Sequence, residues 1–123
     1  MSEEQQRNVY EEPITPCSLD PETGFRRDGY CREILDDPGR HEICAVMTEE
    51  FLEYSKQQGN DLTTPRPAMN FPGLEPGDRW CVCVPRWLEA LEDDVAPPVV
   101  PEATARSVLT HVPLSTIDDY AVE

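Results

Sequence analysis

Proline limits what this chain can fold into more than any other residue. Thirteen prolines are spread over the 123 residues. Proline lacks a backbone N–H and has a fixed φ angle, so it interrupts helix interiors and central strands. The sequence therefore predicts an α+β fold with short strands, three or four short helices and long, ordered Pro/Gly-rich loops. The length fits one domain over residues 1–123, with residues 1–10 expected to be mobile or loosely held.

Two apolar runs predict short strands. Residues 43–47 have the composition of a buried strand. Residues 80–84 alternate, which predicts an apolar face with Trp80, Val82 and Val84 and a thiol face with Cys81 and Cys83. The first 40 residues contain turn signals such as Asp20-Pro21 and Pro38-Gly39 and are expected to be largely irregular.

Capping residues locate the expected helices. Thr48 can cap the first free amides of a helix, and Gly59 can adopt the left-handed conformation that ends it. Pro85 is suited to the first turn of a second helix. Weaker helical signals occupy residues 102–110 and 115–120.

The charge balance restricts the environment and the partners. Asp and Glu number 25 against 10 Lys and Arg, which gives a net charge of −15. Lys56 is the single lysine. This pattern indicates adaptation to a salt-rich cytoplasm, where a Debye length of about 3 Å at 1 M screens carboxylate repulsion; an ordinary acidic protein is the alternative. Nucleic acid and anionic membranes are disfavoured because phosphate binding needs clustered cations, and a monomer or weak dimer is expected.

The cysteines are the main candidates for a functional site. No apolar run resembles a signal peptide or a membrane span, so the chain is expected to be cytoplasmic. There the five cysteines should be reduced, and an odd number fits a disulfide framework poorly. They can pack as small apolar residues, react as thiols or bind a metal such as zinc. The candidate ligands are Cys17, Cys31, Cys44, Cys81 and Cys83.

Two local arrangements refine the thiol hypothesis. Cys81 and Cys83 lie on one strand with Cα atoms about 6.6 to 7 Å apart, at the limit for a disulfide, so they are expected to share one environment and to act together. We expect the pair to be largely buried with another cysteine nearby.

His41 is close in sequence to Cys44 and could activate a thiolate there, although a hydrogen-bonded loop histidine is the alternative. His111 is expected at the surface.

The segment 60–78 is expected to form a long ordered loop. Its first part carries short hydrogen-bonding side chains and holds Arg66 between two prolines, so it can present a guanidinium group to a carboxylate or phosphate. A turn that closes the preceding helix is the alternative. The candidate ligand-binding residues are Asn60, Asp61, Arg66, Asp78 and Glu102. The sequence has no phosphate-binding glycine loop or serine nucleophile elbow, so nucleotide-dependent and standard hydrolase functions lose support.

These motifs together resemble the domain of unknown function 2237 family, a group of uncharacterised bacterial and plant proteins. The resemblance covers most of the chain and includes Pro16-Cys17-Ser18, Gly29-Tyr30-Cys31, Cys44-Ala45-Val46-Met47-Thr48, Gly59-Asn60-Asp61-Leu62 and Trp80-Cys81-Val82-Cys83. It implies a shared fold and a shared site without an assigned activity. The family pattern Glu-Ala-Thr-His is broken here by Ala105. If the histidine of the family pattern serves as a ligand or base in relatives, its role here is lost or taken by His41 or His111.

The sequence predicts a small cytoplasmic binding or accessory domain with a cysteine-lined site near the 60–66 loop. One alternative is a thiol-dependent enzyme that uses a cysteine with His41. Another is an interaction protein whose cysteines only pack. Whether the protein is an enzyme stays open.

Overall fold

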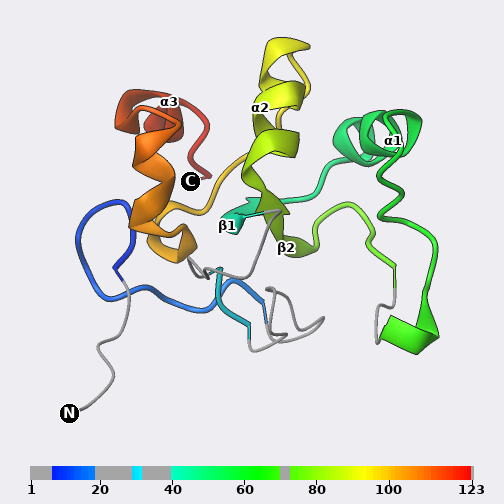
Figure 1. The fold of residues 1–123 in the computed structure, drawn as a ribbon, viewed down its shortest axis with the longest axis horizontal. Coiled ribbons are helices and arrows are strands. Elements are labelled where there is room, and N and C mark those ends of the chain that lie inside the picture. The colour runs from blue at the N-terminus through cyan, green and yellow to red at the C-terminus, as the bar shows by residue number, and fades with distance from the viewer. Residues whose placement is uncertain (1–6, 19–28, 32–39, 70–72, 123) are drawn as a thin grey trace.

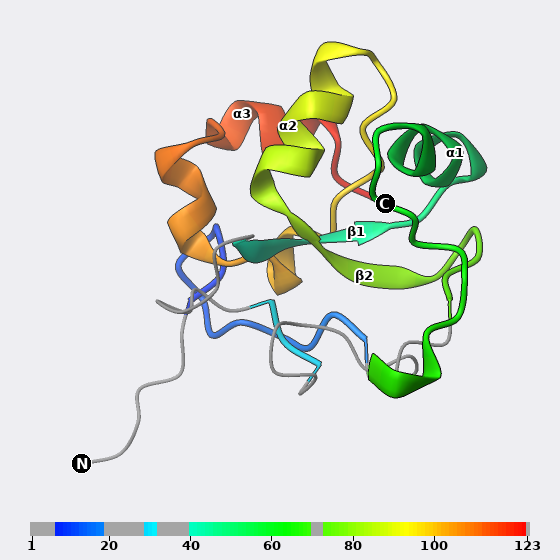
Figure 2. The same ribbon diagram turned by 45° about the vertical axis from the view of Figure 1, so that its right-hand side comes forward.

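Two antiparallel strands form the centre of the molecule. The computed structural model describes residues 7–18, 29–31, 40–69 and 73–122. Strand β1 (His41–Val46) pairs with β2 (Arg79–Cys83), and Cys44 lies opposite Cys81. The α-helices lie on one side of this small sheet, and the N-terminal segment passes along the other side (Figures 1 and 2). The sheet therefore has two different buried faces.

The helices are short, as the distribution of prolines predicts. The α-helices are α1 (Glu49–Gln57), α2 (Val84–Glu92) and α3 (Leu114–Asp119). The 3-10 helices are η1 (Pro67–Met69), η2 (Pro101–Ala103) and η3 (Arg106–Thr110). The predicted α+β class is confirmed. No helix within the described segments is long and apolar enough to cross a membrane.

Local capping fixes the ends of α1. The Thr48 hydroxyl accepts a hydrogen bond from the backbone N–H of Phe51 at 3.0 Å. Glu49 and Glu50 occupy the first turn, where carboxylates interact favourably with the helix dipole. Gly59 has a φ angle of +92° just beyond the helix, in the left-handed region that favours glycine. The predicted start and stop of this helix are confirmed.

The weaker helical signals at residues 102–110 are borne out in part, because the 3-10 helices η2 and η3 cover this range except for Thr104 and Ala105. The chain leaves η2 at Thr104, which has φ −103° and ψ 130° and is therefore extended. The Thr104 hydroxyl donates to the Val100 carbonyl at 2.9 Å and accepts from the Cys44 amide at 3.1 Å. These bonds to a strand replace the helical continuation, and η3 starts only at Arg106.

The larger core lies between the sheet and the helices. Trp87 on α2 is fully buried; its indole N–H donates to the Pro97 carbonyl at 3.1 Å, and its ring meets Tyr120 edge-on at a centroid distance of 5.4 Å. Trp80 and Val82 of β2 point into this core, whereas Cys81 belongs to a separate buried cluster. The alternation predicted for residues 80–84 is confirmed.

The N-terminal segment is tied to the C-terminal part of the chain. Asn8 is 1 % exposed; its side chain donates to the Glu102 carbonyl at 3.1 Å and accepts from the Tyr10 amide at 2.9 Å. The Tyr10 hydroxyl donates to Asp118 at 2.8 Å, and this bond to a carboxylate raises the pKa of Tyr10 to about 12. Residues 1–6 and the predicted turns at Asp20-Pro21 and Pro38-Gly39 lie outside the described residues.

Candidate functional site

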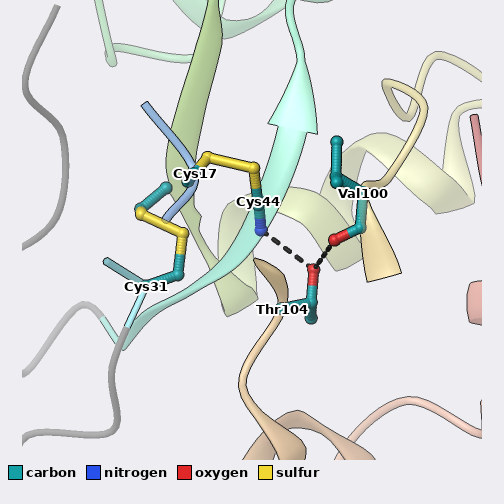
Figure 3. The surroundings of a disulfide bond; sticks show 6 residues. Cys17, Cys31, Cys44, Val100 and Thr104 are labelled. Atoms are coloured by element: carbon teal, nitrogen blue, oxygen red, sulfur yellow. Dashed lines mark hydrogen bonds between the residues drawn. A yellow bond between two sulfur atoms is a disulfide. The ribbon is translucent and has the colours of Figure 1, made fainter. Parts of the chain in front are cut away.

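Four cysteines form two disulfides on the face of the sheet opposite the helices. Cys17 is bonded to Cys44, and Cys31 is bonded to Cys81 (Figure 3). The expectation of five reduced thiols is therefore wrong. Cys44 and Cys81 are cross-strand partners, and the segments that carry Cys17 and Cys31 pass beside them. The Cα–Cα distances of 5.6 and 5.2 Å lie within the range that a disulfide requires.

The two disulfides make up one compact sulfur cluster, which we define as Cys17, Cys31, Cys44 and Cys81. The sulfur atoms of Cys17, Cys31 and Cys81 all lie within 4.8 Å of one another, and that of Cys44 is bonded to Cys17. All four residues are at most 3 % exposed. Their apolar neighbours are Val46, Val100, Ala103 and Val122. The predicted proximity of another cysteine to Cys81 is confirmed.

Thr104 fixes one edge of the sulfur cluster. Its hydroxyl bridges the Cys44 amide and the Val100 carbonyl, as the dashed lines in Figure 3 show. The Val100 amide in turn donates to the Cys44 carbonyl at 2.8 Å. Thr104 is fully buried, so water cannot replace its hydroxyl. Sequence reasoning did not identify this role, because the bond joins residues 60 positions apart.

Replacing Thr104 by valine should lower the free energy of unfolding by about 1–3 kcal/mol, since the buried Cys44 amide loses its acceptor. Urea unfolding of the oxidised protein measures this change. Thr104→Ser is the matched control, because it keeps the hydroxyl and should cost less. A larger loss for Thr104→Ser than for Thr104→Val would show that the methyl group of Thr104, rather than its hydroxyl, stabilises the fold.

A cysteine–histidine pair lies next to the sulfur cluster. All five cysteines lie in the described segments, and Cys83 alone is a free thiol. It is half-buried, and its sulfur is 3.3 Å from Nε2 of His41. Cys44, the expected partner of His41, is instead bonded to Cys17. Cys81 and Cys83 share a face of β2 as expected, but the prediction that they act together is wrong, because Cys81 is in a disulfide and Cys83 is a free thiol.

A β-bulge brings His41 to Cys83. Ile43 pairs with Val82, and His41 pairs with Cys83, so two steps along β1 match one step along β2 and Glu42 is the extra residue. Cross-strand partners point to the same face of a sheet. If the strands paired regularly from Ile43 back to His41, Glu42 would lie opposite Cys83. His41 would then point to the other face of the sheet. The bulge therefore selects the side chain that contacts the thiol.

Buried polar contacts hold the bulge in place. The Glu42 carboxylate is 1 % exposed and accepts hydrogen bonds from Arg40 Nη2 at 3.0 Å and from the Ser107 hydroxyl at 2.8 Å. Arg40 has a φ angle of +54°, uncommon for a residue with a side chain. Ala105 is buried and donates its amide to the Glu42 carbonyl. Sequence reasoning missed Glu42; a carboxylate at the start of an apolar run was the available signal.

The candidate residues of the 60–66 loop form a local turn. Asp61 accepts hydrogen bonds from the backbone and hydroxyl of Thr63 and from the hydroxyl of Thr64. These bonds, the one from the Thr64 hydroxyl foremost, hold the pKa of Asp61 well below its usual range. The Asn60 carbonyl accepts from the Ser55 hydroxyl of α1, and Arg66 is exposed. The contacts of Asp61 match the alternative in which this segment closes a turn after the helix.

The remaining candidates lie in other parts of the chain. Asp78 accepts a hydrogen bond from the Glu75 amide and closes the turn before β2. Glu102 is exposed, and its backbone carbonyl receives the Asn8 side chain. His111 is exposed at the end of η3, as expected.

A pocket opens between α1 and the turn before β2, lined by Glu49, Leu52, Glu53, Lys56, Thr63, Leu74, Glu75 and Pro76.

Comparison with known proteins identifies the family but not an activity. No curated protein matches the chain. The family model described as "Uncharacterized protein conserved in bacteria (DUF2237)" matches residues 7–121. This range contains both disulfides, the bulge and the Cys83–His41 pair. The chain therefore belongs to the DUF2237 family.

Proposed function

We propose that this protein is a thiol-dependent redox domain in which Cys83 is the reactive thiol and His41 is its base. The observation that carries the proposal is the 3.3 Å contact between Cys83 Sγ and His41 Nε2. An imidazole at hydrogen-bonding distance can accept the thiol proton and stabilise the thiolate, which is the nucleophilic form of cysteine.

Accessibility separates Cys83 from the other cysteines. The residues of the sulfur cluster are at most 3 % exposed and are already oxidised, whereas Cys83 is half-buried and carries a thiol. Reactive cysteines need access to a partner as well as a basic or cationic neighbour. Cys83 has both, and the bulge at Glu42 maintains the position of its histidine.

The reaction that fits this pair is thiol–disulfide exchange. His41 takes the proton from Cys83, and the thiolate attacks one sulfur of an external disulfide. A new S–S bond forms to Cys83 as the substrate S–S bond breaks, and the leaving thiolate takes the proton from His41. Cys83 is oxidised in this step and the substrate disulfide is reduced, so no other oxidant is needed.

The second half of the reaction requires an external thiol. Every other cysteine of the chain is paired, so none is free to resolve the mixed disulfide on Cys83. A second thiol must attack it, releasing the Cys83 thiol and a new disulfide. We therefore infer substrates that are small disulfides or mixed disulfides carried by a partner protein.

Alkylation of the native, oxidised protein by iodoacetamide tests the pair. Cys83 should be labelled rapidly at neutral pH, and His41→Gln should slow the reaction at least about tenfold, since the base that removes the proton is lost. His111→Gln is the matched control, because His111 is exposed. Mass spectrometry locates the label, and Cys83→Ser should take up none.

Two results would argue against the redox function. The first is labelling of His41→Gln at the rate of the unaltered protein, which would make Cys83 a free thiol without a base. The second is resistance of Cys83 to alkylation until the protein unfolds, which would support a packing role for all five cysteines.

The acidic composition supports a proposal about the environment. From the net charge of −15 we infer that the protein works in a salt-rich cytoplasm as a monomer or weak dimer, without nucleic acid as a partner. Carboxylate repulsion destabilises the folded state unless salt screens it.

The midpoint of thermal unfolding should therefore rise as KCl is increased into the molar range. Differential scanning calorimetry measures the midpoint at each salt concentration. A non-ionic osmolyte at equal osmolality is the control, because it changes water activity without screening charge. A flat or falling midpoint in KCl would contradict salt adaptation.

A further inference from the structure

We propose that the sulfur cluster is the oxidised form of a zinc site, and that reduction of its two disulfides creates four thiolate ligands for one Zn²⁺ ion. The site would consist of Cys17, Cys31, Cys44 and Cys81. This inference does not depend on the redox function proposed for Cys83, which lies outside the cluster.

The sulfur positions are close to those of a tetrathiolate site. Zinc bound by four thiolates has Zn–S distances of about 2.3 Å, which places the sulfurs of a tetrahedron about 3.8 Å apart. The sulfurs of Cys17, Cys31 and Cys81 already lie within 4.8 Å of one another. Cys44 Sγ is bonded to Cys17 Sγ and so begins in the same small volume. Side-chain rotations, without backbone rearrangement, would bring all four sulfurs to one ion.

The backbone supplies two ligands from the sheet and two from neighbouring segments. Cys44 and Cys81 are cross-strand partners, and the amide of Cys44 is fixed by Thr104. The amide of Cys17 donates to the Gly29 carbonyl at 2.6 Å, which joins its segment to the one that carries Cys31. These hydrogen bonds do not involve the sulfur atoms, so they can persist when the disulfides are reduced.

Burial indicates a structural rather than a catalytic metal. All four cysteines are at most 3 % exposed, and the cluster packs against Val46, Val100, Ala103 and Val122. Such a site has no open position for water or substrate. The ion would perform the same mechanical task as the disulfides, because it too connects the two N-terminal segments to the sheet.

The conversion is balanced when a dithiol is the reductant. Each disulfide reacts with one dithiol molecule, giving two cysteine thiols and the cyclic disulfide of the reductant. The two disulfides together take up four electrons and four protons. Zinc then binds the four sulfurs, and the four thiol protons are released to water.

Cobalt(II) is a suitable probe because its absorption reports tetrahedral thiolate coordination, whereas zinc has no d–d absorption. The full chain is reduced with a dithiol under nitrogen, freed of reductant and titrated with Co²⁺. We expect one Co²⁺ per chain, with intense d–d bands and sulfur-to-cobalt charge-transfer bands that vanish when Zn²⁺ is added. The oxidised protein should show neither band.

Two serine variants on the same strand distinguish the cluster from other thiols. Cys83→Ser should bind Co²⁺ as the unaltered chain does, because Cys83 is not a ligand. Cys81→Ser, two residues away on β2, should weaken Co²⁺ binding at least about tenfold and reduce the charge-transfer intensity. The titration of the unaltered chain remains decisive if Cys81→Ser fails to fold.

The proposal is overturned if the reduced chain shows no charge-transfer bands with Co²⁺. It is also overturned if Cys83→Ser weakens binding as much as Cys81→Ser does. If reduction unfolds the chain, far-UV circular dichroism measures whether Zn²⁺ restores the fold. Recovery of the native spectrum with Zn²⁺ supports the site, and metal uptake by a chain that stays unfolded refutes it.

Discussion

Replacing Cys31 and Cys81 together by alanine should lower the free energy of unfolding by about 4 kcal/mol, one of the largest effects we expect in this protein. The bond joins residues 50 positions apart, so it removes much of the conformational freedom of the unfolded chain. It also ties the segment around Cys31 to the centre of the sheet. Denaturant unfolding without reductant measures the loss.

The Cys17→Ala and Cys44→Ala double variant is the matched control. Its closed loop is shorter, because the two cysteines are 27 positions apart, and the dependence of disulfide stabilisation on loop length gives about 3.5 kcal/mol. Complete reduction of the unaltered chain without metal should destabilise the fold more than either pair of substitutions. If replacing Cys31 and Cys81 lowers the free energy of unfolding by less than about 1 kcal/mol, this disulfide does not restrict the unfolded chain as its loop length predicts.

Trp87→Ala should lower the free energy of unfolding by about 3–5 kcal/mol through the loss of a large buried ring. Trp87 is fully buried between α2 and the C-terminal segment, where it contacts Tyr120 and donates to the Pro97 carbonyl. No nearby side chain can fill so large a cavity without moving the helix. Urea unfolding of the oxidised protein measures the change.

Trp87→Phe separates ring packing from the hydrogen bond. It keeps an aromatic ring in the core but removes the donor to Pro97, so the loss should be smaller than for alanine. Free-thiol counting should give one thiol per folded chain in both variants, because the sulfur cluster lies on the opposite face of the sheet. A loss below about 1 kcal/mol for Trp87→Ala would mean that the core collapses around the missing ring.

The elements set by local chemistry could be predicted from the sequence. Thr48 and Gly59 delimit α1 because capping depends on residues within one or two turns of the helix. The faces of β2 follow from a period of two, which the alternation of residues 80–84 shows directly. Proline at the start of α2 is equally local.

The cysteine pairing could not be predicted, because it depends on contacts that are remote in sequence. An expected reducing compartment and an odd number of cysteines favour free thiols, but neither determines which segments lie beside the sheet. The sequence around Cys17 and Cys31 has no periodic pattern that would place these cysteines beside β1 and β2. Only their path in three dimensions selects Cys44 and Cys81 as partners.

The Cys83–His41 pair was missed for a different reason. Sequence proximity favoured Cys44 as the partner of His41, but Cys44 is bonded to Cys17. In a regular strand pair His41 would lie on the face opposite Cys83, and the one-residue bulge at Glu42, which Arg40 and Ser107 hold, brings it to the same face. A sequence pattern of period two does not reveal an added residue.

The two disulfides also constrain the order of events during synthesis. Their connectivity is interleaved, since Cys17 and Cys31 leave the ribosome before either of their partners, Cys44 and Cys81. Early oxidation would therefore join Cys17 to Cys31, a pairing that has to be undone. The Cys31–Cys81 bond can form only after β2, which carries Cys81, has been translated. The complete set of native disulfides is therefore a late product of synthesis.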